Sequence, residues 1–300
     1  EYDIDLVKKH EKTRKDKEDD RMRHILTLRS QTGPVFLTCR PLPALVAQVE
    51  AIMTTVPMTD FTANDGIRHT VWRVSAAAEV AAIAAAFAKA PALYIADGHH
   101  RAASASRVRA ELRKENPHHN GDEEYNRFLS VIFPSDQLAI LPYNRLVLDL
   151  NGLTKEQFLD KCRAAGFTLE NADSANPTQP GVVHAYLGGG QWLKLTSTAD
   201  RSKLAATDRL DVSLLQDLIL APILGIDDPR TSTRIEFVGG IRGTQPLEEK
   251  VDQGKAGVAF SMYPTTVEQL MEIADDGGIM PPKSTWFEPK LRDALLIHDI

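Results

Sequence analysis

The spacing of apolar and polar positions predicts interleaved strands and helices along the first half of the chain. Apolar or alternating runs typical of strands occur at residues 33–40, 69–75, 91–97, 127–134 and 138–150. Helical spacing occurs at residues 43–55, 76–89 and 99–113. A further helix with one buried stripe is expected before residue 30, from the near-helical spacing of Met22, Ile25, Leu26 and Leu28.

The second half starts near Asn151 and mixes both kinds of element. Helical spacing occurs at residues 153–166, 210–225 and 266–277, and strand patterns occur at 182–197 and 254–264. The tail is expected to end in an apolar strand. Because strands and helices mix throughout, the predicted fold class is α/β or α+β with a mixed sheet. A soft boundary near residue 150 divides the chain into residues 1–150 and 151–300.

Composition excludes several classes of protein. The 300 residues carry a net charge of −6, which provides no positive field for phosphate backbones, so no nucleic-acid partner is expected. Cys39 and Cys162 are far apart in sequence, so neither thiolate-bound zinc nor a disulfide framework is expected. No apolar run reaches about 18 residues, so no membrane span is expected. A cytoplasmic protein is the default expectation.

The stretch YIADGHHRAASAS carries the most specific chemistry. An apolar strand ends at Asp97, Gly98 follows, and His99, His100 and Arg101 open a helix of small residues. Such a turn exposes the unpaired amide groups and the positive dipole end of a helix, which favour an anion. Gly98 permits close backbone approach or a positive φ. The guanidinium group of Arg101 can donate hydrogen bonds to two phosphate oxygens at once. Asp97 can position a hydroxyl group or Mg²⁺.

Two other interpretations of this turn remain open. Asp97 can be the helix cap, and the histidines can then lie in the first turn without a functional role. The paired histidines can also belong to a metal site, although adjacent helix residues point about 100° apart and zinc needs a histidine pair at i and i+4. The strand–glycine–helix setting favours the anion site.

Two stretches near the ends of the chain are further candidates. HEKTRKDKEDDR is typical of a solvated helix start, but Glu11 can act as a general base if it is buried beside cations, and Arg14 can bind phosphate. MPPKSTWFEPKL presents a charge and two hydroxyls on Lys283, Ser284 and Thr285. It is equally compatible with a buried aromatic latch that leaves Lys283 exposed.

Two stretches of the middle and second half complete the set. GIDDPRTSTRIEFVGGIRG places Arg230 beside Asp227 and Asp228, a kind of cluster that is often purely structural. LPYNRLV can direct Asn144 and Arg145 toward the same cleft, but a polar strand edge explains that stretch equally well.

In this order, the motifs HExTRxxKExDR, GPVFL, YIADGHHRAASA, LPYNRLV, DDPR…RIEFVGGIRG and MPPKSTWFEPKL resemble those of a widespread bacterial family of unknown function. The resemblance covers essentially the whole chain and implies that members carry further residues before the point where this chain starts. The DGHHR turn also resembles the nucleotide loop of the ParB/sulfiredoxin superfamily. That superfamily includes free-serine kinases with an Asp-Gly-x-His-Arg-like turn.

The resemblance implies a ParB/sulfiredoxin-like nucleotide-binding core over residues 1–150 and an α+β subdomain over 151–300 that closes the site. It also implies a kinase that uses ATP or ADP with Mg²⁺ to phosphorylate a small hydroxyl substrate, with free L-serine favoured. Where sulfiredoxins have a cysteine this chain has His99, which argues against sulfinic-acid repair. The acidic net charge argues against ParB-type DNA binding.

In this hypothesis Glu11 takes the proton of the acceptor hydroxyl, Asp97 orients that hydroxyl or the metal, and His100 holds the transferring phosphate. The expected nucleotide-binding residues are Gly98, His99, Arg101, Arg14, Arg230, Lys283, Ser284 and Thr285. No resident metal site is assigned. Two rival hypotheses are a nucleotide-binding regulatory protein without enzymatic activity and a metal-dependent hydrolase that uses Asp97 and the histidines. A homodimer is a further expectation.

Overall fold

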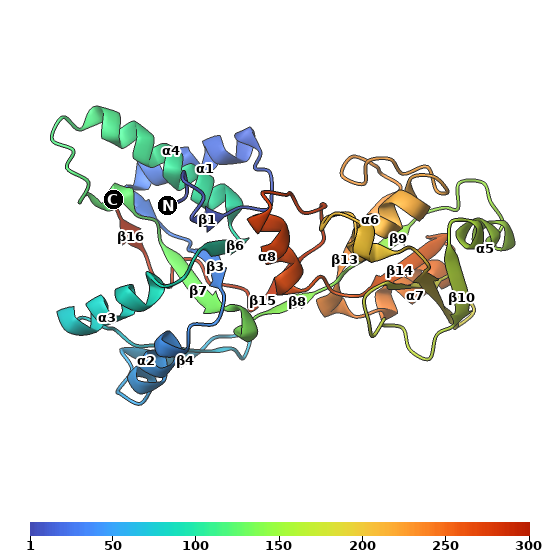
Figure 1. The fold of residues 1–300 in the computed structure, drawn as a ribbon, viewed down its shortest axis with the longest axis horizontal. Helices are drawn as coiled ribbons and strands as arrows, with labels where there is room; N and C mark the ends of the chain where they lie inside the picture. The colour runs from blue at the N-terminus through green and yellow to red at the C-terminus, as the bar shows by residue number, and fades with distance from the viewer. The chain divides into compact units, whose positions relative to one another are not determined.

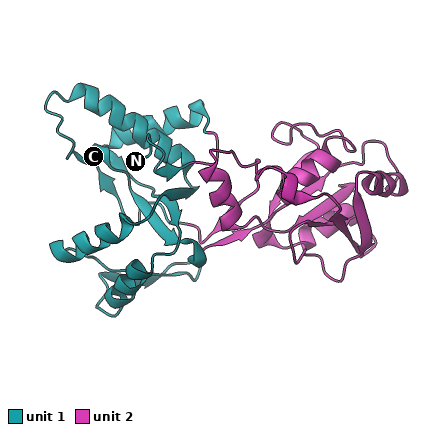
Figure 2. Cartoon of the chain, in the orientation of Figure 1, with its two compact units in different colours: residues 1–8, 13–137, 291–300 teal, residues 9–12, 138–290 magenta.

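The computed structural model describes residues 1–300 as a mixed α/β protein, which confirms the predicted class (Figure 1). Contacts divide the chain into two compact units (Figure 2). Unit 1 consists of Glu1–Lys8, Thr13–Gln137 and Leu291–Ile300, and unit 2 of Lys9–Lys12 and Leu138–Lys290. Each unit therefore combines segments that are far apart in the sequence. None of the helices has both the length and the apolar character that crossing a bilayer requires.

Unit 1 is built on a four-stranded mixed sheet in the order β1-β6-β3-β7. Strand β3 runs parallel to β7 and antiparallel to β6, while β1 runs parallel to β6. The strands are β1 (Val7–Lys8), β3 (Val35–Cys39), β6 (Leu93–Asp97) and β7 (Ser130–Pro134). Apolar side chains from this sheet pack with Ala102 of helix α4 (His99–Glu115), so the core holds the start of α4 against the strands.

Helix α1 (Lys15–Leu28) packs against α4. Ile25 of α1 is buried against Val108 and Leu112 of α4, as the predicted stripe requires. Leu28 is different, because 49% of its surface is exposed, so the stripe ends before the last residue of the helix.

A third part of unit 1 contains helix α2 (Pro43–Met53), the hairpin β4–β5 and helix α3 (Ala77–Phe87). Strands β4 and β5 span Thr59–Thr62 and Arg68–Val71. The strand predicted over 69–75 thus ends at Val71. The alanine-rich helix forms as predicted, and Ala86 is its only buried residue.

Unit 2 is built on a six-stranded sheet in the order β10-β12-β11-β14-β9-β13, in which every neighbouring pair is antiparallel. Its strands are β9 (Tyr143–Val147), β10 (Phe167–Asn171), β11 (Val182–Tyr186), β12 (Trp192–Ser197), β13 (Ile235–Gly239) and β14 (Val258–Met262). A separate pair joins β8 (Ala139–Leu141) to β15 (Trp286–Glu288). The main core contains Phe158, Leu215 and Phe260, which joins the sheet to its helices.

The helices of unit 2 are α5 (Lys155–Ala164), α6 (Asp211–Leu215), α7 (Gln245–Asp252) and α8 (Val267–Asp275). Helices α5 and α8 both begin at a Thr-x-x-Gln capping box, which pairs two of the amide groups that a helix start leaves without partners. Helix α6 is shorter than the predicted 210–225 helix because the chain changes to a π-helical turn over Gln216–Leu220.

The predicted apolar strand at the end of the tail is wrong. Only His298–Asp299 form a strand, β16, which pairs with β2 (Ser30–Gln31). Leu295, Leu296 and Ile297 precede it and are all exposed. Their consecutive apolar character predicted a buried strand, but the short β2 offers only two residues for pairing.

Candidate functional site

The DGHHR turn joins a strand to a helix through a glycine, as the sequence predicts. Strand β6 ends at Asp97, Gly98 has a φ of +99°, and α4 begins at His99. A side chain at Gly98 would be strained, because L residues rarely adopt this left-handed conformation. The helix cap is Gly98 itself and no side chain caps the helix, so the interpretation of Asp97 as the cap is wrong. The first amide groups of α4 therefore have no side-chain acceptor at the cap.

The two histidines of the turn lie in different environments. His99 is buried, with 4% of its surface exposed, and His100 is half-buried. The backbone N–H of Arg14 donates to Nε2 of His100 over 3.1 Å. A neutral His100 ring therefore carries its proton on Nδ1, which is the nitrogen that can donate to an anion.

No group of three or more histidine, cysteine, aspartate or glutamate side chains in the chain is arranged to hold a metal ion. The geometry thus adds no support to the metal-dependent hydrolase. Asp97 is exposed at the end of β6.

Arg101 already has an anionic partner in unit 1. Its Nη2 donates to both carboxylate oxygens of Asp293, over 2.9 and 3.1 Å, and its Nη1 donates to the carbonyl of Pro34 over 3.5 Å. A Cβ at Gly33 would lie 3.0 Å from Nε of Arg101 and 2.6 Å from Oδ1 of Asp293. The glycine of the GPVFL motif therefore allows this ion pair to lie against the backbone.

Arg14 approaches the turn through its backbone. Its guanidinium group donates to both oxygens of Asp16, over 3.1 and 2.8 Å, and its side chain is exposed. The structure thus brings Arg14 beside His100, while its charge is neutralised by the first turn of α1.

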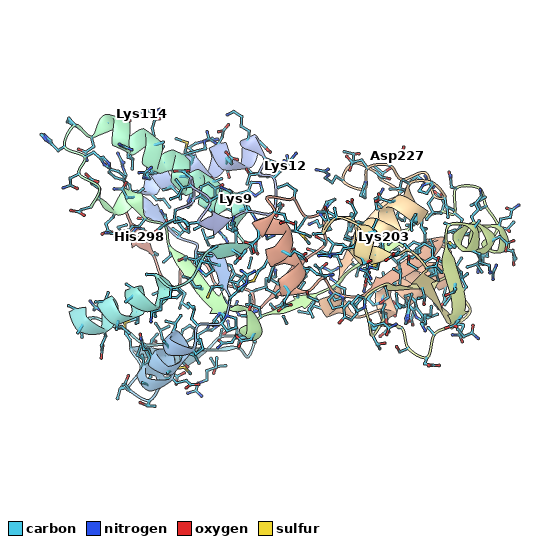
Figure 3. The ribbon with its side chains drawn as sticks, in the orientation of Figure 1. Lys9, Lys12, Lys114, Lys203, Asp227 and His298 are labelled. Carbon is cyan, nitrogen blue, oxygen red and sulfur yellow. The ribbon has the colours of Figure 1, made fainter.

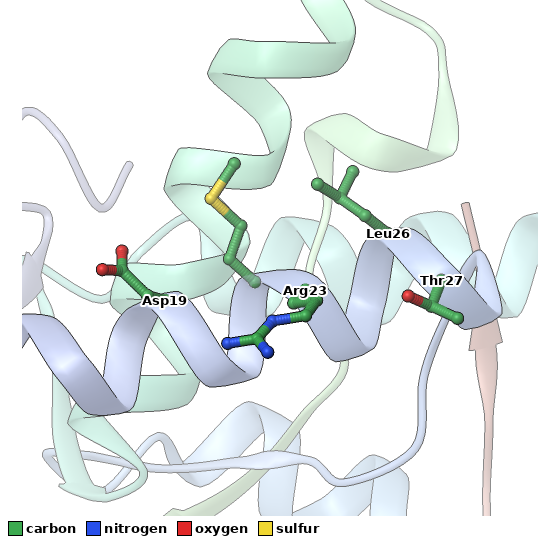
Figure 4. A pocket seen from close by; sticks show the side chains of 5 residues that line it. Asp19, Arg23, Leu26 and Thr27 are labelled. Atoms are coloured by element: carbon green, nitrogen blue, oxygen red, sulfur yellow. The ribbon is translucent and has the colours of Figure 1, made fainter.

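Two cavities of unit 1 lie along α1, and one of these two includes a predicted site residue. The larger cavity, about 340 Å³, follows one face of α1 and is lined by Asp19, Met22, Arg23, Leu26 and Thr27 (Figure 4). The smaller one, about 30 Å³, is lined by Arg21, His24, Ile25, Gln31, Thr32, Gly33, Val35 and Arg101. The smaller cavity therefore lies where Arg101 and the GPVFL motif meet.

In unit 2, Lys283, Ser284 and Thr285 lie together in the loop before β15. Lys283 has a φ of +54°, and its Nζ lies 5.4 Å from the ring centroid of Tyr143. Ser284 is buried, and its hydroxyl donates to the carbonyl of Pro281 over 2.8 Å. That hydroxyl holds the loop in shape, whereas Lys283 is exposed.

Arg145 is the support of this loop. It is buried on β9, and burial lowers its pKa to about 10. Its guanidinium donates to the carbonyl of Tyr143 and, over 3.2 Å, to that of Lys283, and it lies 5.4 Å from the ring centroid of Phe237. Because β9 lies between β14 and β13, LPYNRLV is not a polar strand edge.

The Gly-Gly pair of the VGGIRG motif is explained by packing. A Cβ at Gly239 would lie 2.5 Å from Cε3 of Trp286, and one at Gly240 would lie 2.7 Å from Cδ of Pro142. Trp286 also meets Tyr143 edge to face, with ring centroids 5.4 Å apart. These glycines allow the aromatic part of MPPKSTWFEPKL to pack closely against the sheet.

Arg230 forms only a local ion pair. Its Nε lies 3.5 Å from Oδ1 of Asp228, its side chain is 67% exposed, and no hydrogen bond joins it to the Lys283 loop. Asp227, in the same loop, is labelled in Figure 3.

Glu11 belongs to the short segment of unit 2 that follows β1, and Lys9 and Lys12 of this segment are labelled in Figure 3. Glu11 is exposed in the structure and not buried beside cations. The neighbouring His10 is buried, and its carbonyl accepts a hydrogen bond from the backbone N–H of Met280 over 2.8 Å. The structure thereby joins the HEKTR and MPPKST motifs.

His10 makes stability depend on pH. Burial lowers the pKa of His10 from 6.5 to about 4, so the unfolded chain binds this proton more readily than the folded chain does. The contribution of the neutral ring is complete above pH 6.5 and is lost as the pH falls toward 4, by about 3 kcal/mol in total. Free energies of unfolding at pH 7.5 and 4.5 test this, because the wild type should lose more than His10→Gln. Equal losses would contradict it.

Asp293 is the site residue that sequence reasoning missed. It lies 192 positions from Arg101. In that part of the tail the sequence predicted only an apolar strand. No local pattern signals a pair at that separation.

The fold and the turn define a class: a two-unit α/β protein with a glycine-entered, uncapped helix start. A family model described as "Protein of unknown function (DUF1015)" matches residues 1–213, and the chain belongs to this family. The comparison with curated proteins found no match.

Solved structures similar to the chain include a free serine kinase variant in complex with AMP, at 13% identity and a TM-score of 0.47, covering 95% of this chain and 85% of the kinase. SbnI from Staphylococcus aureus, with a C-terminal truncation, is similar at 11% identity and a TM-score of 0.48, covering 96% and 82%. A conserved hypothetical protein from Pyrococcus furiosus is similar at 14% identity and a TM-score of 0.44, covering 97% and 90%.

Proposed function

We propose that this protein is a kinase that transfers a phosphoryl group from ATP or ADP, with Mg²⁺, to a small hydroxyl-bearing acceptor, and that free L-serine is the favoured acceptor. The observation that carries the proposal is the start of α4, which Gly98 enters at a φ of +99° and which no side chain caps. Backbone amides and the positive end of a helix dipole at such a start bind phosphate oxygens. We also propose that unit 1 is a ParB/sulfiredoxin-like core and that the reaction is cytoplasmic.

In unit 1, the proposed roles follow from the geometry of the turn. The α4 amides at His99 and His100 and the guanidinium of Arg101 hold the phosphates, and Nδ1 of His100 donates a further hydrogen bond. Asp97, exposed at the strand end, would orient the acceptor hydroxyl or hold Mg²⁺, which would supply positive charge beside the phosphates. Positioning and charge neutralisation of this kind supply most of the catalysis in phosphoryl transfer.

We propose further roles for residues outside the DGHHR turn. Glu11 accepts the proton of the acceptor hydroxyl, and Lys283 neutralises charge that develops on the phosphoryl group. Ser284 keeps the loop in shape through its bond to Pro281, and Thr285 adds a hydroxyl beside it. Arg14 contributes through its contact with His100, and Arg230 contributes only its charge.

The decisive test of the kinase is direct detection of its product. Purified protein is incubated with L-serine, Mg²⁺ and either ATP or ADP, and phosphoserine is measured by ³¹P NMR and mass spectrometry. We expect saturable formation of phosphoserine. Saturable nucleotide binding without transfer to any hydroxyl amino acid would instead support the regulatory protein. Hydrolytic activity that chelation abolishes and that zinc or manganese restores, but Mg²⁺ does not, would support the hydrolase.

A variant of His100 tests the placement of the site. We expect His100→Ala to weaken ADP binding about tenfold, because one hydrogen bond to a charged group contributes about 1.5 kcal/mol. His118→Ala, in the exposed loop before residue 126 of unit 1, is the matched control and should leave binding unchanged. Titration calorimetry measures both. Unchanged ADP affinity in His100→Ala would place the nucleotide elsewhere.

A further inference from the structure

The tail of unit 1 delivers a carboxylate to Arg101. The backbone N–H of Ala294 donates to the carbonyl of Thr32 over 2.6 Å, directly after Asp293. Farther along, β16 pairs with β2, and the N–H of Ile300 donates to the carbonyl of Arg29 over 2.9 Å. The position of Asp293 is therefore set jointly by backbone pairing of the tail and by its bond to Arg101.

The surroundings of this carboxylate contain more basic groups than one carboxylate can pair. Arg21 and His24 line the same cavity of about 30 Å³ as Arg101. Neither side chain makes a hydrogen bond or an ion pair in the structure, whereas Arg107, six residues after Arg101 on α4, is paired with both Glu18 and Asp19. A cavity with several basic side chains attracts an anion with more charge than a carboxylate carries.

The existing ion pair is easily exchanged. The side chain of Asp293 is 58% exposed and that of Arg101 is 28% exposed, and ion pairs so close to solvent contribute little to stability. A phosphate group carries up to two charges and three free oxygens, so it can take both Asp293 contacts on Arg101.

We infer that Asp293 is an internal competitor for the anion site at Arg101: its carboxylate holds Arg101 when no ligand is bound, and the phosphate group of a ligand displaces it. Arg21 and His24 then face the incoming phosphate. The inference rests on the proposed function only for the identity of the ligand, because any phosphate group can make the exchange. Displacement frees the segment that precedes β16, so binding of phosphate and order in the tail are coupled.

The test compares two tail variants that remove the same charge. Asp293→Asn keeps a side chain of the same shape without the charge, and we expect it to bind inorganic phosphate about two- to fivefold more tightly than the wild type does. Asp299→Asn is the control, because Asp299 accepts a hydrogen bond from Ser30 over 2.7 Å and does not contact Arg101. It should bind phosphate as the wild type does. Calorimetry at constant ionic strength gives the affinities.

A second measurement follows the tail itself. We expect phosphate to accelerate hydrogen exchange at the amide of Ala294 in the wild type, because that amide is held beside Asp293. The inference is overturned if phosphate does not bind, if both variants change its affinity equally, or if exchange at Ala294 is unaffected.

Parallel titrations with ADP separate this inference from the proposed function. If Asp293→Asn binds phosphate more tightly than the wild type does and ADP does not bind, the kinase proposal is contradicted and the inference about Asp293 is supported. If ADP binds equally well to the wild type and to Asp293→Asn, and phosphate affinity does not differ between them either, the inference about Asp293 is contradicted and nucleotide binding is supported.

Discussion

Replacement of Arg101 by alanine is expected to weaken ADP binding about 100-fold. In the proposed complex its guanidinium forms charge-assisted hydrogen bonds to phosphate, and the loss of about 3 kcal/mol of such bonding corresponds to a factor of about 100 in affinity. Titration calorimetry at constant ionic strength measures the change. The fold should persist, because the present partner of Arg101, Asp293, is exposed and can be solvated after the substitution.

Arg107 provides the matched control for that experiment. It lies six residues after Arg101 on α4 and is paired with Glu18 and Asp19 over 3.1 and 2.6 Å. Arg107→Ala removes an equal charge from the same helix, so any general electrostatic effect on ADP appears in both variants. Equal losses of affinity would show that Arg101 makes no specific contact with the nucleotide.

Replacement of Arg145 by alanine is expected to lower the free energy of unfolding by about 3–5 kcal/mol. The substitution leaves a cavity in the core and removes the donors to the carbonyls of Tyr143 and Lys283. Denaturant unfolding, followed by circular dichroism, measures the change. Arg163→Ala is the control, because Arg163 forms an exposed pair with Asp160, and it should lose less than about 1 kcal/mol. Similar losses in both variants would contradict a supporting role for Arg145.

A lysine variant tests whether the two hydrogen bonds of the Arg145 guanidinium group are needed in addition to its charge. Arg145→Lys keeps a positive charge, but one ammonium group cannot reach both carbonyls with the fixed geometry of a guanidinium. We expect faster proteolysis in the loop that contains Lys283 in this variant, because Lys283 then loses the bond that holds its backbone at a φ of +54°. This links a structural residue of LPYNRLV to a proposed charge in the site.

The local elements could be predicted because their determinants lie within a few residues of one another. The capping boxes of α5 and α8 are set by a threonine and a glutamine three positions later. The strand–glycine–helix turn is set by an apolar strand followed at once by Gly98 and a run of helix formers. The same local logic failed for the tail, where three consecutive apolar residues resemble a buried strand but find only the two residues of β2 to pair with.

Partners of side chains across the chain could not be predicted in this way. The sequence shows which candidate residues are basic, but whether each one has an acidic partner depends on which segments pack together. Arg230 and Arg14 have nearby acidic partners, Arg145 is buried in a central strand, and Arg101 is held by a residue from the tail. These differences decide which of the four can meet a ligand.

By itself, therefore, the sequence determined the mixed α/β class, most of the helices and the strand–glycine–helix order of the DGHHR turn, because backbone sterics and hydrogen bonding act between near neighbours. It did not predict helix α7, and it left open whether Gly98 has a positive φ. Only the tertiary structure decided that Asp293 lies on Arg101, that Arg145 supports Lys283, and that residues 9–12 pack with unit 2. Those contacts join positions separated by more than a hundred residues, and each forms only when the core of a single unit brings distant segments together.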